Sequence, residues 1–180
     1  MKVMLLMAQT VDGKIARARD ELIDWTSKED KKFFVAETKR VGVVVMGSRT
    51  FMTFGRPLPG RHIIVMTRQE PAPALVREET EKEGVVPGTV EFTNDPPQKI
   101  IERLSAHGRE EVIVAGGPTT NNLFLEAGLI DEIKLSIEPK LFGSGLSVFE
   151  GSTLNQELEL LSVTNLTPHV IVVHYKIRKA

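Results

Sequence analysis

The sequence predicts one α/β domain over residues 1–180, in which a mixed, mostly parallel sheet is flanked by helices and ends in an antiparallel C-terminal hairpin. Three observations predict this fold class. The 180 residues are 41% hydrophobic, which is enough for one full core. Short β-branched runs alternate with helical stretches as far as residue 127, as in parallel sheets. Beyond residue 130 longer strands follow one another directly.

The first two thirds of the chain predict the parallel strands. Each of these strands is a short apolar run, typical of strands buried on both faces, and they are expected at residues 2–9, 41–46, 62–67, 89–93 and 111–115. Residues 27–40 and 96–107 predict amphipathic helices. The second of these helices opens with Asp95 as a cap before two prolines, which a first helical turn tolerates. Residues 68–88, rich in Glu and Pro, predict a solvated connection with about one helical turn.

The last third predicts a helix and three longer strands. The helix spans residues 119–127 and is closed by Gly128, because glycine suits the left-handed position after a helix end. Strands are expected at residues 130–138, 157–166 and 169–178. The last two are joined across residues 166–168 and predict an antiparallel hairpin.

Composition excludes several functional classes. The 23 Lys and Arg residues nearly balance the 24 Asp and Glu residues, so no overall field favours nucleic acid or an anionic membrane. The chain has no cysteine, which excludes disulfides, a thiol nucleophile and a cysteine-ligated zinc site, and its four histidines show no metal-ligand spacing. The apolar residues 1–8 are too short to span a bilayer. We expect a cytoplasmic protein without a metal, and neither a Walker loop nor a G-x-S-x-G elbow is present.

Two glycine-containing turns follow apolar strands and precede helices. Residues 115–119 read AGGPT and residues 46–51 read MGSRTF. Open backbone at a helix start attracts phosphate, and Ser48, Arg49 and Thr50 add hydroxyls and a cation. Two such turns at neighbouring strand ends suit the two ends of a dinucleotide. Taken alone, the turn at residues 115–119 is equally compatible with a tight turn that needs glycine for its backbone angles. Without that second turn, Arg49 would be read as a solvated surface arginine.

Two further features are candidates for chemistry. Thr67 and Arg68 end another strand and could hold the 2'-phosphate that distinguishes NADPH from NADH, although an ordinary turn has the same pattern. Asp30 lies four residues before Phe34 on one helix face, so we expect its carboxylate to point inward, as the Phe34 ring does. Such a carboxylate could bind a heterocycle and assist its protonation. The alternative is a carboxylate that only complements the helix dipole.

These residues, taken in order, resemble the dihydrofolate reductase superfamily. Residues 46–51, followed by residues 55–61 (GRPLPGR), are similar to the signature between the second and third strands of those enzymes. The resemblance implies a dihydrofolate-reductase-like three-layer fold that binds NADPH. It places the cofactor on Ala8, Ile15, Gly47, Ser48, Arg49, Thr50, Thr67, Arg68, Ala115, Gly116, Gly117 and Thr119.

The same resemblance implies the substrate site. Trp25, Asp30 and Phe34 fall at the spacing of the family, which implies that Asp30 is the catalytic carboxylate that binds a pterin ring and promotes its protonation. Trp25 and Phe34 would contact the substrate, and Arg61 would hold the carboxylate of a folate.

Other segments resemble the reductase domain of riboflavin biosynthesis, which is the C-terminal domain of the bifunctional deaminase-reductase. The matching segments are residues 12–16, 25–27, 116–125 and 138–145. This resemblance implies NADPH-dependent reduction of a phosphoribosylaminouracil and a homodimer through the C-terminal strands. A zinc deaminase precedes the reductase in the bifunctional enzymes, so a chain without cysteine or an N-terminal extension is expected to be a stand-alone reductase.

We therefore expect an NADPH-dependent reductase resembling 5-amino-6-(5-phosphoribosylamino)uracil reductase, with Lys14 and Arg61 as cations near a substrate phosphate. Dihydrofolate reductase is the alternative, supported by Asp30, which departs from the riboflavin pattern. Residues 10–16 and Asn121 depart in turn from the folate pattern. A non-catalytic nucleotide-binding protein that keeps the fold is a third reading.

Overall fold

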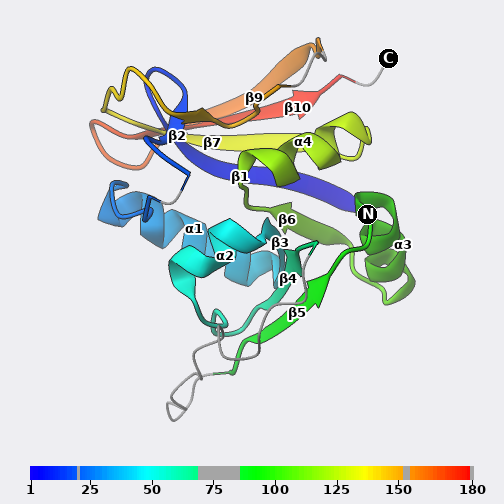
Figure 1. Ribbon diagram of the computed structural model, residues 1–180. Helices are drawn as coiled ribbons and strands as arrows, with labels where there is room; N and C mark the ends of the chain where they lie inside the picture. Colours follow the sequence, from blue (N-terminus) through cyan, green and yellow to red (C-terminus); the bar gives the residue numbers. More distant parts are fainter. Residues whose placement is uncertain (20, 69–85, 152–154, 179–180) are drawn as a thin grey trace.

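The computed structural model describes residues 1–19, 21–68, 86–151 and 155–178 (Figure 1). The helices are α1 (Lys28–Val41), α2 (Ser48–Phe54), α3 (Pro97–Ala106) and α4 (Pro118–Glu126). The strands are β1 (Lys2–Thr10), β2 (Lys14–Ala16), β3 (Val43–Gly47), β4 (His62–Met66), β5 (Thr89–Thr93), β6 (Glu111–Val114), β7 (Glu132–Glu138), β8 (Leu146–Ser147), β9 (Leu158–Asn165) and β10 (Ile171–Ile177).

The large sheet has eight strands in the order β5-β4-β3-β6-β1-β7-β10-β9. The six strands from β5 to β7 are parallel, with β1 between β6 and β7. β10 runs antiparallel to β7 and to β9, so the C-terminal hairpin extends the sheet at one edge. The predicted mixed, mostly parallel sheet with an antiparallel hairpin is confirmed.

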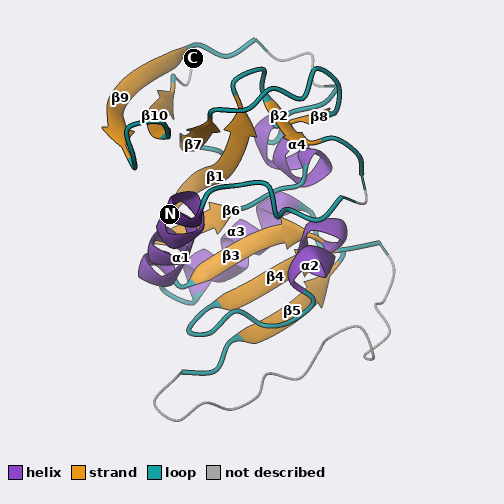
Figure 2. Cartoon of the chain, turned by 90° about the vertical axis from the view of Figure 1, so that its left-hand side faces the viewer, coloured by secondary structure: helices purple, strands orange, loops and turns teal. Residues whose placement is uncertain are grey.

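Helices cover both faces of the sheet, which gives three layers (Figure 2). One face packs Met4, Val44 and Ile63 against Phe51 of α2 and the partly buried phenylalanines of α1. The other face packs alternate strand residues, such as Leu5, against α3 and α4. Since successive side chains of a strand point to opposite faces, the continuous apolar runs of the sequence supply both cores at once.

The predicted elements agree with the structure to within a few residues, with one correction. Asp95 was expected to cap α3, but the helix begins one residue later, with Pro96 at the N-cap position and no side-chain cap bond. Pro97 forces Pro96 into the extended conformation, so the helix begins at Pro97. The sequence reading also missed the two-stranded sheet of β2 and β8. Most of the connection predicted at 68–88, residues 69–85, lies outside the described residues.

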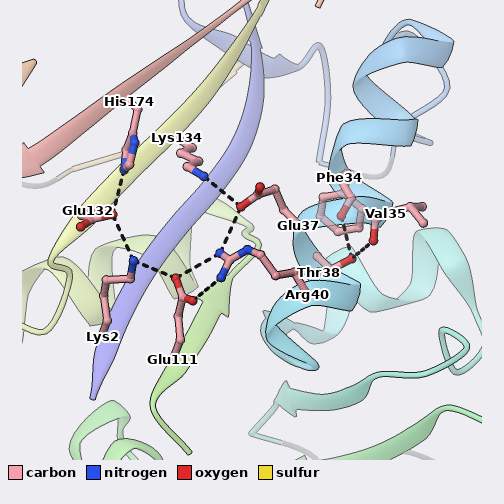
Figure 3. Close-up of polar contacts among 10 residues, drawn as sticks. All are labelled: Lys2, Phe34, Val35, Glu37, Thr38, Arg40, Glu111, Glu132, Lys134 and His174. Carbon is pink, nitrogen blue, oxygen red and sulfur yellow. Dashed lines mark hydrogen bonds and ion pairs between the residues drawn. The ribbon is translucent and has the colours of Figure 1, made fainter. Parts of the chain in front are cut away.

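A chain of ion pairs joins the C-terminal half of α1 to the amino ends of the strands (Figure 3). On α1, Glu37 contacts Lys134 (2.9 Å) and Arg40 (3.2 Å), and Arg40 also contacts Glu111 (2.6 Å). Lys2 contacts Glu111 (3.1 Å) and Glu132 (3.5 Å), and Glu132 contacts His174 (2.8 Å). Hydrogen bonding from Arg40 outweighs burial and holds the pKa of Glu111 below its usual value. The network fixes α1 on the sheet at the end opposite to the carboxyl ends of the parallel strands.

Among the described residues, no helix is long and apolar enough to cross a membrane, and no group of three or more His, Asp or Glu side chains is placed to hold a metal ion.

Candidate functional site

A cavity of about 1240 Å³ lies at the carboxyl ends of the parallel strands. Its lining reaches from Thr93, at the end of β5, across Gly47 and Ala115 to Ser136 of β7. Because β5 and β7 are separated by four strands in the sheet, the cavity extends across the carboxyl ends of these strands. Open α/β sheets bind their ligands at the carboxyl ends of the strands, so the position of the cavity agrees with a binding site.

The two glycine turns predicted from the sequence pack against one another. The Gly47 N–H donates a hydrogen bond of 2.8 Å to the carbonyl oxygen of Gly116, and the Gly116–Gly117 peptide bond is cis. A Cβ added to Gly47 would lie 2.8 Å from Thr120 Oγ1, and one added to Gly117 would lie 3.3 Å from Thr50 Oγ1. The contact therefore leaves room at Gly47 only for glycine, and together the turns form one rim of the cavity.

Hydroxyls and cations line the cavity beside this rim. Arg49 and Thr50 belong to the first turn of α2, and Arg68 follows β4. The side chains of Arg49 and Arg68 are exposed, so both guanidiniums can approach a ligand from solvent. Ser48, Thr67 and Thr119 line the same wall. Arginine pairs with phosphate through two parallel hydrogen bonds, and this part of the cavity therefore suits a phosphorylated ligand.

Asp30 occupies the first turn of α1 and lines the cavity although it is only 7% exposed. Burial raises the pKa of its carboxyl group, and the nearby charge of Glu138 raises it further. The hydroxyls of Ser136 and Thr26 act in the opposite direction, as does the charge of Lys31. Burial prevails, so Asp30 retains its proton at a higher pH than an exposed aspartate does.

Aromatic side chains form the wall on the α1 side. Phe34 of α1 and Phe54 of α2 are stacked with 6.3 Å between ring centroids and 10° between ring planes. Trp25 donates from Nε1 to the Ile15 carbonyl oxygen at 3.2 Å and meets Phe142 edge to face. Flat apolar walls of this kind suit a planar ring.

Arg61 is buried at the same end of the cavity, where it is 6% exposed. Its Nη1 donates to Thr38 Oγ1 at 3.0 Å, and its Nε donates to the Pro59 carbonyl oxygen at 3.1 Å. These bonds hold the guanidinium between α1 and the segment that follows α2.

The loop before β2 is attached to a distant segment. The carboxylate of Asp12 accepts hydrogen bonds from the backbone N–H of Phe142 (3.2 Å) and of Gly143 (2.7 Å) and from the Thr10 hydroxyl. β2 then pairs with β8. Residues 12–16 and 138–145, which carried part of the riboflavin-type resemblance, therefore meet in space.

Fifteen of the seventeen residues proposed from the sequence line this one cavity: Ala8, Ile15, Trp25, Asp30, Phe34, Gly47, Ser48, Arg49, Thr50, Arg61, Thr67, Arg68, Ala115, Gly117 and Thr119. Gly116 lies buried behind the rim. Lys14 does not contribute to the lining, because its Nζ donates to Ser147 Oγ at 3.2 Å across the β2–β8 pair.

The sequence analysis missed several residues of the lining. Thr93 is the last residue of β5, and Asn94 and Asp95 follow it as Thr67 and Arg68 follow β4. This repeated position at a strand end was a signal that could have found them. Ser136 gave no such signal, because only the pairing of β7 with β1 brings it to the cavity.

Comparison with known proteins agrees with these features. The chain is 26% identical to the riboflavin biosynthesis protein RibD of Aquifex aeolicus over 174 residues, covering 81% of this chain and 48% of that protein. It is 20% identical to the uncharacterized protein YyaP of Bacillus subtilis over 97% of this chain and 94% of that protein. A shorter stretch of 50 residues, 28% of this chain and 30% of the relative, is 48% identical to dihydrofolate reductase type 3 of Salmonella typhimurium.

A solved structure has the same fold. The diaminohydroxyphosphoribosylaminopyrimidine deaminase/5-amino-6-(5-phosphoribosylamino)uracil reductase of Thermotoga maritima superposes with a TM-score of 0.75 at 20% identity, covering 98% of this chain and 56% of that one. The chain thus spans about half the length of the Aquifex aeolicus and Thermotoga maritima proteins. The family model for the RibD C-terminal domain matches residues 1–172. The chain with the fold and cavity described above therefore belongs to the RibD C-terminal domain family.

Proposed function

We propose that this chain is an NADPH-dependent reductase of a small heterocyclic substrate, of the 5-amino-6-(5-phosphoribosylamino)uracil reductase type. The observation that carries the proposal is that the glycine rim, the exposed arginines and the buried Asp30 all line one elongated cavity. Family membership supports an oxidoreductase. Binding sites for one small ligand usually enclose about 300–1,000 Å³. A cavity of about 1240 Å³ has room for a dinucleotide and a second ring.

The residues present fit a nicotinamide dinucleotide. Gly47 and Gly117 line the cavity without side chains, so a ligand can approach the backbone of this rim closely. Ser48, Thr50 and Arg49 provide donors for the phosphates beside the rim. Arg68, at the end of β4, would pair with a 2'-phosphate, which favours NADPH over NADH.

When bound, the nicotinamide supplies the hydride. The protein positions the substrate between the aromatic wall of Trp25 and Phe34 and the rim, and it excludes water from the ring. Because burial raises its pKa, the Asp30 carboxyl keeps its proton to a higher pH than an exposed aspartate does. It can therefore share that proton with the substrate atom that gains electron density.

The first experiment is NADPH oxidation by the purified protein, with the ribosylaminopyrimidine phosphate and dihydrofolate offered separately. Turnover of the pyrimidine alone is the expected result. NADPH binding without turnover of either compound would overturn the proposed substrate class, and failure to bind NADPH would overturn the proposed cofactor.

Arg68→Ala should raise the KM for NADPH about tenfold or more and leave the KM for NADH unchanged, because a charge-assisted contact with the 2'-phosphate is lost. Exposed Arg109, after α3, provides the matched control variant.

Dihydrofolate reduction is a second candidate, and a specific observation favours it. Buried Asp30 and Arg61 line the same cavity as the stacked Phe34 and Phe54, which suits a pterin ring with an acidic tail. Turnover of dihydrofolate that methotrexate inhibits would select this function in place of the first.

We also propose that two copies of the chain associate through β9. All eight residues of this edge strand are exposed, including Leu158, Leu160, Leu161 and Val163. An apolar, unpaired strand edge is normally covered, and a second β9 can extend the sheet by a symmetric antiparallel pairing. Light scattering should give the mass of a dimer, and Leu160→Lys should reduce it to that of a monomer. A monomeric wild-type protein at micromolar concentration would contradict the proposal.

A further inference from the structure

A second buried carboxylate lies beside the one in the cavity. Glu138, the last residue of β7, is only 2% exposed and does not line the cavity. Glutamate is almost never fully buried unless its charge has partners. Within the described part of the chain, its side chain is held by one residue: Oε1 accepts hydrogen bonds from Ser27 N–H at 2.8 Å and from Ser27 Oγ–H at 2.7 Å.

Ser27 is the N-cap of α1, and it transmits this contact to the cavity. Its Oγ accepts a hydrogen bond of 3.1 Å from the backbone N–H of Asp30. Since the hydroxyl proton is donated to Glu138, the lone pairs of Oγ are oriented toward the N–H group of Asp30. The cap bond, which any serine could make, is thus tied to one strand of the sheet.

We propose that Glu138 is a positioning residue for the proposed reductase reaction: it anchors the first turn of α1 to the end of β7 and so fixes the Asp30 carboxyl in the cavity. This inference rests on the proposed function for its catalytic consequence. Its structural part, the anchoring of Asp30 by Glu138 through Ser27, holds for whichever substrate the cavity takes.

Glu138 also acts on Asp30 through its charge. Burial is the largest cause of the raised pKa of Asp30, and the negative charge of Glu138 on β7 adds to it. Opposing it are Lys31 on the same helix, the Thr26 hydroxyl before the helix and the Ser136 hydroxyl on β7. The two roles of Glu138 can be separated, because glutamine keeps the acceptor for Ser27 but removes the charge, whereas alanine removes both.

The test uses the substrate-free protein. The side-chain carboxyl signal of Asp30 is followed by carbon NMR as a function of pH, and Asp30→Asn identifies it. Glu138→Gln should lower the pKa of Asp30 and leave hydrogen exchange at the Asp30 N–H near the wild-type rate.

Ser27→Ala should speed hydrogen exchange at the Asp30 N–H at least tenfold while the charge of Glu138 stays, and Ser27→Thr should restore protection. Glu29→Gln, in the same helical turn, is the charge control and should shift the pKa of Asp30 far less than Glu138→Gln.

Turnover then separates positioning from a general loss of structure. Glu138→Ala and Ser27→Ala should lower kcat about tenfold to a hundredfold with an unchanged KM for NADPH, because small displacements of a reacting group are costly. Glu138→Gln should keep most of kcat but move the alkaline limb of its pH profile, where Asp30 loses its proton, to lower pH. If Glu138→Ala does not fold, the glutamine and serine variants still decide the result.

An unchanged pKa of Asp30 in Glu138→Gln together with unchanged exchange in Ser27→Ala would overturn the inference. The titration and the exchange experiment need no substrate. A protein without reductase activity would therefore overturn the proposed function while these two measurements still judged the anchoring of Asp30.

Discussion

At the scale of single residues, Asp30 has an unfavourable position for stability. Its carboxyl group is buried in the cavity wall, and burial together with Glu138 raises its pKa. An acid whose pKa is raised by folding stabilises the native state most at low pH. That contribution is lost as the pH rises through the raised pKa, and above that pKa the folded protein holds a carboxylate that would be better solvated in the unfolded chain. Such a cost is common where a group is kept for its chemistry.

Asp30→Asn should therefore separate activity from stability. Turnover at neutral pH should fall about a hundredfold or more, because assistance to protonation is lost. The free energy of unfolding should not fall, and the advantage of the variant over the wild type should grow as the pH is raised from 4 to 7. Urea unfolding of both proteins across this pH range measures the difference in their free energies of unfolding. A variant that is less stable than the wild type at pH 7 would contradict the argument.

Gly47→Ala tests the packing of the two glycine turns. The φ angle of Gly47 is −77°, an ordinary value for alanine, so the effect is purely steric. The added Cβ would lie 2.8 Å from Thr120 Oγ1. We expect a loss of about 1–3 kcal/mol in the free energy of unfolding and weaker NADPH binding.

Thr120→Ala removes the atom that would clash and serves as the second arm of a double-mutant cycle. The cost of Gly47→Ala should be clearly smaller in the Thr120→Ala background. Equal costs in both backgrounds would show that the two turns do not pack as the structure has them.

At the scale of elements, α1 is held at both ends by different physical means. Its first turn is anchored by the Ser27 cap to β7, and its last turns are held by the ion pairs of Arg40 and Glu37 (Figure 3). The end near the cavity is buried and the other end is partly exposed, so only the second should respond strongly to salt.

Arg40→Ala should lower stability modestly and leave catalysis intact. The side chain is 48% exposed, so its pairs with Glu111 and Glu37 are screened and the expected loss is about 0.5–1 kcal/mol at low salt. The loss should shrink at molar salt. Because pairing lowers the pKa of Glu111, its contribution should also disappear as the pH falls through that lowered pKa. Urea unfolding at two salt concentrations measures the effect, with Lys39→Ala as the control from the same helical turn.

The elements themselves were largely predictable, for reasons visible in particular residues. The run from Val43 to Met46 is apolar on both faces, which marks a buried parallel strand in any context. β2 and β8 were missed because three and two residues carry no period of their own and exist only through their mutual pairing. Likewise Glu138 looked like part of a family motif, and only the register of β7 beside β1 revealed that it is buried next to Asp30.

At the scale of the whole molecule, the cavity couples ligand binding to the stability of the entire sheet. Its lining comes from both sides of the molecule, from β5 to β7, so a ligand that fills it binds only the folded chain. NADPH at a hundred times its Kd should add about 2.7 kcal/mol to the free energy of unfolding.

For a chain of this length the stabilisation corresponds to a rise in Tm of about 5–10 °C. Differential scanning calorimetry with NADPH and with NADH at equal concentration measures it. NADPH should give the larger shift, and Arg68→Ala should make the two shifts equal. Equal shifts in the wild type would remove the assigned role of Arg68.

The central position of β1 has a consequence for how the protein is made. β1 is synthesised before both of the strands that flank it in the sheet, because Lys2 pairs with Glu111 and Met4 pairs with Glu132. Val3, Met4, Leu5 and Leu6, all buried in the finished sheet, therefore remain an unpaired apolar strand until β6 and β7 have been synthesised. Contacts between such distant residues slow folding and expose the nascent chain to aggregation. Expression at low temperature or with a chaperone that shields the emerging N-terminal strand should accordingly improve the yield of native protein.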